Sequence, residues 1–259
     1  MNQLHVIIAA FLQEWKSTVS VTTYLAQLGG IVARSAALAW IASQSENRAL
    51  LTYIYIGAPL MAIWFWLIWR VGWSLNNEIG GRTLDFTLIS RAPVVSILFG
   101  KTLSQVAYFI PAGVISFITV FLVSGELPEI ADVWVLPFSL LLVIIGIVAA
   151  SLLFSPLIVL IGGRGGFFNA LMPFGAVLCG FIMPVERLPL VLEVVARCLP
   201  TSWAMESIWL GVEGYESLGL IMRGWGMSIL LSVVLLSATY LMCNAVMKRI
   251  RVTGTLGIY

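Results

Sequence analysis

Long apolar runs separated by short polar segments dominate the pattern of this chain. A helix crosses a hydrocarbon core about 30 Å thick with about 20 residues. The runs predict six membrane-spanning helices, at about residues 20–43, 52–74, 97–123, 134–161, 167–183 and 224–247. The composition agrees, because 60% of the residues are hydrophobic and only 10% are charged, whereas a soluble domain carries about 25% charged residues. We therefore expect one all-α polytopic membrane domain over residues 1–259.

Residues 1–19 predict an amphipathic helix that lies in the membrane interface. Apolar side chains recur there at helical spacing, while polar side chains take the other positions. A simple extension of the first span is the alternative. We expect no removable signal peptide, because no basic region precedes a short apolar core with a cleavage site. The apolar positions are Leu4, Ile7, Ile8, Phe11, Leu12 and Trp15.

Residues 184–223 have a different pattern. Prolines interrupt them, charges recur every few residues, and no window of about 20 residues is apolar enough to span. Two short amphipathic segments, at about 188–199 and 202–213, predict helices that dip partway into the membrane and pack against protein. The segment 184–223 is therefore predicted to be an external re-entrant helical hairpin before the sixth span.

The distribution of basic residues predicts the orientation. Six spans place both termini on one side, and that side carries most of the lysines and arginines. The opposite side carries nine of the twelve acidic residues. By the positive-inside rule the termini are cytoplasmic, and we expect a bacterial cytoplasmic (inner) membrane location. The basic residues on the terminus side are Lys16, Arg70, Arg82, Arg91, Lys101, Arg164, Lys248, Arg249 and Arg251.

Several kinds of chemistry are excluded. Gly100-Lys101-Thr102 resembles the end of a phosphate-binding loop, but Val95 stands where that loop needs its first glycine and no strand precedes it. His5 is the only histidine, and the three cysteines lack metal-ligand spacing. Paired acids inside spans, typical of ion-coupled carriers, are missing. We therefore expect no enzyme activity, no metal, no cofactor and no nucleic-acid partner for this chain.

Two polar or aromatic features inside spans allow two interpretations each. Arg34 lies in the first predicted span and has no carboxylate in any predicted span to pair with. It either extends to the outer surface or lines a polar translocation path. Trp66, Trp69 and Trp73 share a helical face of the second span. An interfacial aromatic belt explains them, and a stacking surface for substrate is the alternative.

The polar stretch at residues 75–93 interrupts two spans and predicts a short amphipathic helix. Leu84 and Leu88 share one face, charged residues flank them, and Pro93 follows the end. Such a face fits a groove of a cytoplasmic partner. A solvated turn is the alternative.

The residues in and after this stretch resemble a known motif. Glu78-Ile-Gly-Gly-Arg-Thr-Leu-Asp-Phe-Thr-Leu, followed by Pro93 and Gly100-Lys101, is similar to the segment after the second span of type 2 ABC exporter permeases. Gly180-Phe-Ile-Met-Pro184-Val-Glu-Arg-Leu-Pro189, followed by Leu199-Pro200-Thr-Ser-Trp, resembles the outward hairpin of that family. The resemblance covers essentially the whole chain. The sequence departs from the pattern at Arg82, which separates the glycine and threonine of the motif.

The resemblance implies a permease that forms the translocation path as a dimer, with an identical or a sister chain. Separate cytoplasmic ATPase subunits, which use ATP and Mg, would drive it. The path would lie between the first, second and fifth spans, and the hairpin would close its outer exit. The implied ATPase-coupling residues are Glu78, Arg82, Leu84, Asp85, Leu88 and Arg91. Candidate path residues, for which core packing is the alternative, are Arg34, Trp66, Asn169, Met172 and Phe174. Candidate external-gate residues are Pro184, Glu186, Pro189 and Pro200.

The substrate does not follow from this resemblance. Drugs, lipids, peptides and glycans all remain candidates, because a fold does not decide among them. Two other functions also remain open. One is a stand-alone channel or secondary carrier, and the other is a non-transporting subunit that anchors an enzyme complex in the membrane.

Overall fold

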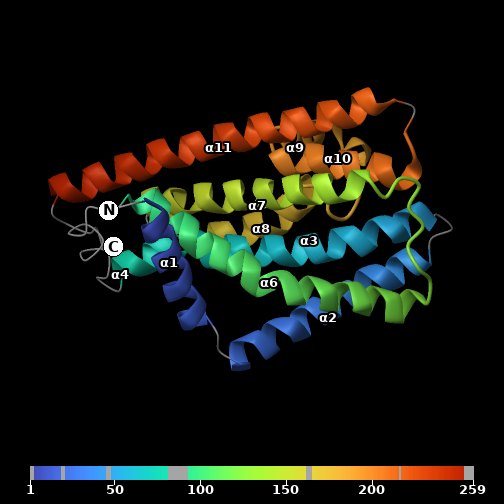
Figure 1. The fold of residues 1–259 in the computed structure, drawn as a ribbon, viewed down its shortest axis with the longest axis horizontal. Helices are drawn as coiled ribbons and strands as arrows, with labels where there is room; N and C mark the ends of the chain where they lie inside the picture. The colour runs from blue at the N-terminus through green and yellow to red at the C-terminus, as the bar shows by residue number, and fades with distance from the viewer. Residues whose placement is uncertain are drawn as a thin grey trace.

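The structure is a computed structural model, and it describes residues 3–18, 21–44, 48–80, 93–161, 165–215 and 217–253. Within these ranges every regular element is a helix (Figure 1), so the all-α prediction is confirmed. The helices are α1 (Gln3–Thr18), α2 (Val21–Ser43), α3 (Arg48–Gly72), α4 (Ser74–Gly80), α6 (Val94–Ser124), α7 (Val135–Leu160), α8 (Gly165–Leu178), the 3₁₀ helix η1 (Val185–Arg187), α9 (Leu190–Ala196), α10 (Pro200–Glu213) and α11 (Leu218–Thr253).

Several of these helices suit a membrane. Four stretches of the described chain are long and apolar enough to cross it: Leu50–Ile79, Val94–Ser124, Val135–Leu160 and Leu218–Arg249. The structure is therefore compatible with a multi-pass helical membrane protein. The presence of six spans stays a prediction. The predicted fifth span at 167–183 is only partly helical. Its helix α8 ends at Leu178, and Gly180 follows in the left-handed region with φ 79°, which a helix cannot continue through.

The helices α3 and α7 form the centre of the bundle, and α6 and α11 lie at its periphery. Of the apolar stretch in each helix, 83% is buried for α3 and 67% for α7, against 28% for α6 and 22% for α11. Figure 1 shows these four helices running along the long axis of the molecule. Their peripheral faces carry large exposed apolar side chains such as Ile118 and Leu122 on α6 and Leu241 on α11. Such faces suit lipid.

Glycines allow the backbones to approach closely at the helix contacts. A Cβ atom added at Gly57 of α3 would lie less than 3.0 Å from the carbonyl oxygen of Phe181, in the turn after α8. One added at Gly146 of α7 would lie 2.9 Å from Cγ2 of Thr201, on α10. Small residues at such contacts are the usual means of helix packing in membranes. Tyr53 strengthens the first contact by donating a hydrogen bond to the Gly180 carbonyl.

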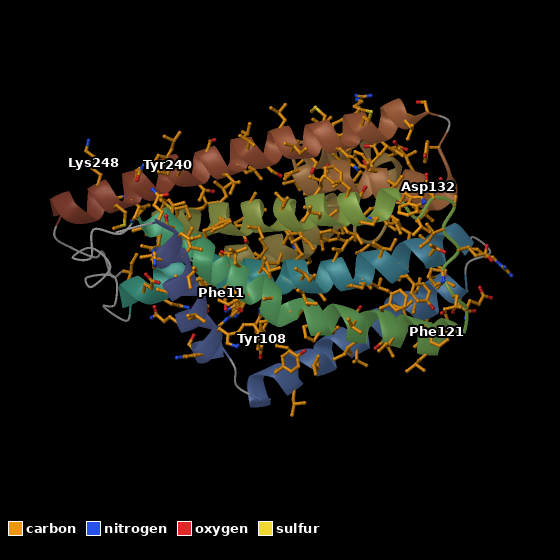
Figure 2. All side chains as sticks on the ribbon, in the orientation of Figure 1. Phe11, Tyr108, Phe121, Asp132, Tyr240 and Lys248 are labelled. Carbon is orange, nitrogen blue, oxygen red and sulfur yellow. The ribbon has the colours of Figure 1, made fainter. Side chains whose placement is uncertain are left out.

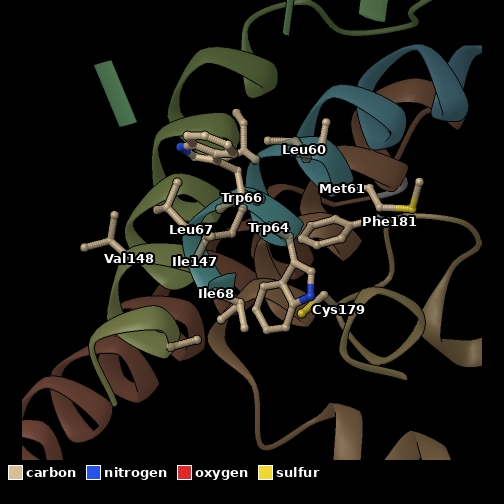
Figure 3. Packing of buried hydrophobic residues seen from close by; sticks show 14 of the residues in the cluster. Leu60, Met61, Trp64, Trp66, Leu67, Ile68, Ile147, Val148, Cys179 and Phe181 are labelled. Carbon is tan, nitrogen blue, oxygen red and sulfur yellow. The ribbon is translucent and has the colours of Figure 1, made fainter. Parts of the chain in front are cut away.

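Aromatic side chains fill the space around α3. Figure 3 shows Trp64 beside Phe181 and Cys179, and the two aromatic ring centroids lie 6.1 Å apart. The indole Nε1 of Trp64 donates to the Met172 carbonyl on α8 at 3.1 Å. The turn at Gly180 is thus fixed from two sides, which explains why α8 stops where it does against α3.

Different elements lie at the two ends of the bundle. α1, α4 and the C-terminal end of α11 lie at one end, and the loop 125–134 lies at the other (Figure 1). Figure 2 places Lys248 and Asp132 at these opposite ends. This arrangement places α1, α4 and the end of α11 away from the loop 125–134. Which end faces the cytoplasm stays a prediction.

Candidate functional site

An ion pair joins α4 to α6. Lys101 Nζ contacts Glu78 Oε1, and the two side chains are only 13% and 11% exposed. These residues flank the segment 81–92, which lies outside the described residues. Because α4 follows α3 directly, the pair connects the end of α3 to the start of α6. The pair therefore holds α4 against α6.

Glu14 of α1 extends this ion pair into a cluster. Its Oε1 atom accepts a hydrogen bond of 2.6 Å from Nε2 of Gln105 and lies 3.4 Å from Nη2 of Arg70. Its Oε2 atom lies 3.9 Å from Nζ of Lys101. Among the contacts described, two carboxylates face two cations, and partly buried charges need such partners. We name Glu14, Arg70, Glu78, Lys101 and Gln105 the charged cluster.

Trp66 packs at the edge of the charged cluster. Its indole Nε1 donates to Oε1 of Gln105 at 2.9 Å, and its ring stacks on Phe109 and Tyr108 at centroid distances of 5.2 and 5.7 Å. The guanidinium of Arg70 lies 5.8 Å from the ring centroid. The side chain is 4% exposed and lies in the core (Figure 3). In this chain Trp66 therefore supports Gln105, and a role in a translocation path stays a prediction.

Gly100 lets α1 cross α6 at close range. A Cβ atom at this position would lie less than 3.0 Å from the carbonyl oxygen of Ile7 and 2.9 Å from Cβ of Ala10. The crossing seats Glu14 next to Lys101. It leaves an outward apolar face on α1, where Leu4 is 59%, Ile8 48% and Leu12 51% exposed. The predicted amphipathic helix is thus present, and its insertion into the membrane interface stays a prediction.

A polar cleft of about 230 Å³ opens at the charged cluster. It lies between α1, α3, α4 and α6, at the base of the segment 81–92. Its walls carry ion pairs, one amide and two serine hydroxyls, so the cleft is polar. The residues that line it are Glu14, Ser17, Arg70, Ser74, Asn77, Glu78 and Lys101.

The charged cluster contains only one of the six predicted coupling residues, Glu78. The other five, Arg82, Leu84, Asp85, Leu88 and Arg91, lie outside the described residues. Neither Glu14 nor Gln105 was among the predicted site residues. One signal was available for the first of them, because Glu14 is an acid within an otherwise apolar and basic terminal helix.

The remaining candidate path residues occupy different settings. Arg34 on α2 is half-buried, and its guanidinium lies 5.2 Å from the ring centroid of Phe65 on α3. On α8, Met172 is buried, whereas Phe174 is 62% exposed and Asn169 is also exposed. The exposed positions on α8 suit contact with another chain or with lipid, and the path itself stays a prediction.

The prolines of the predicted hairpin mark its helix starts. Pro184 precedes η1, Pro189 precedes α9, and Pro200 is the first residue of α10, where a proline costs no hydrogen bond. The two predicted amphipathic segments at 188–199 and 202–213 correspond to α9 and α10. Their re-entry into a membrane, and a role as a gate, stay predictions.

Arg197 holds the hairpin together, a role that the sequence analysis did not foresee. Its guanidinium forms an ion pair with Glu206 of α10 and lies 3.6 Å from carboxylate oxygens of Glu186 in η1 and Glu193 in α9. It also lies 4.6 Å from the ring centroid of Trp203, whose Nε1 donates to the Arg197 carbonyl at 2.9 Å. One cation thus connects three elements, and Glu186, predicted at the gate, is one of its partners.

The outward face of α9 is apolar. Leu190 and Val191 are 76% and 75% exposed, and Val194 and Val195 follow one turn later at 60% and 48%. Three carboxylates of the hairpin, those of Glu186, Glu193 and Glu206, instead contact Arg197. The hairpin therefore carries both an exposed apolar face on α9 and an ionic cluster around Arg197.

Comparison with protein-family models and comparison with curated proteins each gave no match. The function is therefore argued from the residues and their geometry.

Proposed function

We propose that this chain is the transmembrane subunit of an ATP-driven exporter of the type 2 ABC class. It would form the translocation path as a dimer, with an identical or a sister permease. Separate cytoplasmic ATPase subunits would bind ATP and Mg and dock on the segment 81–92. The resemblance of residues 78–101 and 180–203 to that class supports the proposal, together with the apolar helices suited to a membrane.

The contact between Glu78 and Lys101 carries the proposal. Both residues belong to the motif that supports the resemblance, and they stand 23 positions apart in the sequence. In the fold they meet and join α4 to α6, the two helices on either side of the intervening segment. A docking segment must be held at both ends if a partner is to move the helices behind it. This ion pair can supply that attachment. It would give Glu78 and Lys101 of the motif one shared role, which is to join the helices on either side of the docking segment.

The charged cluster could transmit a movement of a docked partner to the helices of the bundle. ATP can drive transport only if it favours one conformation of the ATPase pair over the other. A displacement of the segment 81–92 would act on α3 through α4 and on α6 through Lys101. Glu14 contacts Lys101, so α1 would move with them. Since α3 is the most buried of the long helices, its movement would rearrange the whole bundle.

The proposed location is a bacterial cytoplasmic membrane with both termini in the cytoplasm. The charged cluster then lies at the cytoplasmic end, and the hairpin held by Arg197 lies outside. There the hairpin would form the outer end of the path, with the apolar face of α9 toward the outer leaflet.

The test is purification of the tagged chain from its native membranes in a mild detergent. We expect an ATP-hydrolysing chain with an intact phosphate-binding loop to copurify, and ATP hydrolysis to accompany the complex. The variant Leu84→Asp should lower this association about tenfold, equivalent to about 1.4 kcal/mol. The matched control is Leu218→Asp, which changes an exposed leucine at the other end of the bundle and should leave the association unchanged.

Two results would count against the proposal. The first is a solubilised chain, free of any ATPase, that still moves solute across a vesicle membrane, as a channel or carrier would. The second is ATPase association that Leu84→Asp and Leu218→Asp affect equally. Membrane insertion of both variants, measured by extraction with alkaline carbonate, separates a docking defect from misfolding.

A further inference from the structure

Arg34 is the one charged residue of α2. No oppositely charged side chain lies on the helices packed against it, within the described residues. Neither α2 nor the helices packed against it, α3 and α6, contain an aspartate or glutamate between Val21 and Ser43, Arg48 and Gly72, or Val94 and Ser124. On α1, Glu14 contacts Gln105, Arg70 and Lys101.

The guanidinium of Arg34 points into the span and away from the nearer helix end. Arg34 stands nine residues before Ser43, about 13 Å along the axis at 1.5 Å per residue. Side chains of a helix lean toward its N-terminus, and this one does so. A Cβ atom built on Gly30 would lie 3.9 Å from Nη2 of Arg34. The side chain therefore extends toward the middle of α2, and it does not reach for the surface beyond Ser43.

The contacts of the guanidinium satisfy it only in part. One of its faces lies over the Phe65 ring at 5.2 Å, which stabilises a cation without neutralising it. Its Nε atom is buried and has no hydrogen-bond partner among the described residues. Apart from Nη2 of Arg34, no atom is found within 4 Å of a Cβ atom built on Gly30, and Arg34 itself is partly exposed. A group arriving from the outer surface of α2 can therefore reach the remaining donors.

We propose that Arg34 and the Phe65 ring form a recognition site for a negatively charged group, a phosphate or a carboxylate, on the transported molecule. An unpaired arginine within a span is costly unless it meets water, protein or an anion. The planar donors of the Arg34 guanidinium match the oxygens of phosphate and carboxylate. The buried Nε atom could donate a hydrogen bond to such an oxygen. The inference rests on the proposed export function and assigns the substrate to the anionic class.

The test measures anion binding to the purified chain, with its ATPase partner where that partner copurifies. Two probes separate the two sources of the group. Phosphatidylglycerol, followed by native mass spectrometry with phosphatidylcholine as the neutral control, represents a lipid headgroup. Inorganic phosphate, followed by the shift in thermal unfolding, represents a free anion. The variants are Arg34→Met and Arg34→Lys. Lys16→Met, which removes one exposed charge from α1, controls for general attraction to anions.

We expect at least one probe to bind the wild-type chain and Arg34→Met to weaken that binding about tenfold. Arg34→Lys should weaken it less than about threefold, because it keeps the charge and loses the planar fork. Lys16→Met and the phosphatidylcholine values should not change. Dependence of phosphatidylglycerol alone on Arg34 assigns a lipid headgroup, and dependence of phosphate alone assigns a soluble anion.

Three results overturn the proposal: neither probe binds the wild-type chain, both bind Arg34→Met as well as wild type, or Lys16→Met weakens binding equally. Thermal unfolding keeps the test valid if a variant folds poorly. An anion site predicts that Arg34→Met is at least as stable as wild type without anion, and that added anion no longer shifts it. A structural role predicts the reverse, with a lower unfolding temperature that Arg34→Lys restores. Loss of the ATPase would not change any of these binding values, so the two proposals fail separately.

Discussion

Glu78 and Lys101 form a partly buried ion pair that fastens the end of α4 to the first turns of α6. We expect Glu78→Lys to lower the free energy of unfolding by about 1.5–3 kcal/mol, because it leaves Lys101 beside a second cation. The exchanged double variant, Glu78→Lys with Lys101→Glu, should recover part of this loss, because the new carboxylate at position 101 also faces Glu14. Thermal unfolding in detergent measures both.

The control for this exchange is an ion pair that is exposed. Arg48 and Glu129 lie 3.3 Å apart, and their side chains are 71% and 75% exposed. Reversing either of them should change the stability by less than about 1 kcal/mol. Equal losses at the two pairs would contradict a special role for Glu78 and Lys101.

Gly100→Ala should loosen the contact between α1 and α6. The new Cβ atom would overlap the Ile7 carbonyl and the Ala10 methyl group, and overpacking of this kind costs about 1–3 kcal/mol. A cysteine at position 10, in a Cys198→Ser background, would report the change by faster alkylation. Gly113→Ala on the same helix is the control, because its Cβ atom would meet only Pro59 Cβ, at 3.8 Å. Slow alkylation in both variants would show that the crossing does not depend on Gly100.

Gly57→Ala should be more damaging than any other glycine change on α3. The added atom would overlap the backbone of Phe181, which cannot move away as a flexible side chain can. We expect a loss of about 3 kcal/mol or more and poor yield of folded protein. Gly226→Ala provides the comparison, since no atom lies within 4 Å of its added methyl group. A folded Gly57→Ala variant with unchanged unfolding temperature would refute the tight contact.

Arg197→Met should open the hairpin. It leaves the carboxylates of Glu186, Glu193 and Glu206 without their shared cation, and removing one partner of a charged hydrogen bond costs about 1.5–3 kcal/mol. Proteolysis between residues 188 and 199 should then become about tenfold faster or more. Arg187→Met tests the specificity, because Arg187 contacts only the Trp209 ring, at 5.3 Å, among the interactions described for it. Equal proteolysis of the two variants would count against the idea that Arg197 holds η1, α9 and α10 together.

Tyr215 should ionise at higher pH than a free tyrosine. Its hydroxyl donates a hydrogen bond to Oδ2 of Asp132 at 2.6 Å, and this bond, with burial and the carboxylate charge, raises the pKa of Tyr215. The contact therefore stabilises the loop below about pH 10, the ordinary tyrosine pKa, and is lost as the pH rises through the higher value. Carbon-13 NMR of the tyrosine ring can follow this titration, with Asp132→Asn expected to lower the pKa. An unchanged pKa in that variant would exclude the hydrogen bond as its cause.

The existence of the helices could be predicted from the sequence, while their ends depended on neighbours. The segments at 188–199 and 202–213 became α9 and α10 because proline starts and amphipathic spacing are local signals. The end of α8 at Leu178 is different. It depends on a turn at Gly180 that packs against Gly57 and Tyr53, which are more than 120 residues earlier in the chain.

The site shows the same division. Charge and spacing drew attention to Glu78 and Lys101, but not to their contact. The position of Glu14 depends on how α1 crosses α6. That crossing depends on Gly100, which has no side chain to keep the two helices apart. Likewise, Trp66 and Trp69 share a helical face in the sequence, yet Trp66 is 4% exposed and Trp69 is 46% exposed. The difference comes from Tyr108 and Phe109, whose stacking no periodicity reveals.

The hydrogen bond from Tyr53 to the Gly180 carbonyl has a consequence for biogenesis. The two residues are separated by 127 positions, so a ribosome that adds about 5–20 residues per second reaches the acceptor roughly 6–25 s after the donor. During that interval the polar hydroxyl of Tyr53 must be satisfied by water, by lipid headgroups or by the insertion machinery. Among the four apolar stretches long enough to span, the one that contains α3 is the most buried. It is thus synthesised early and completed late.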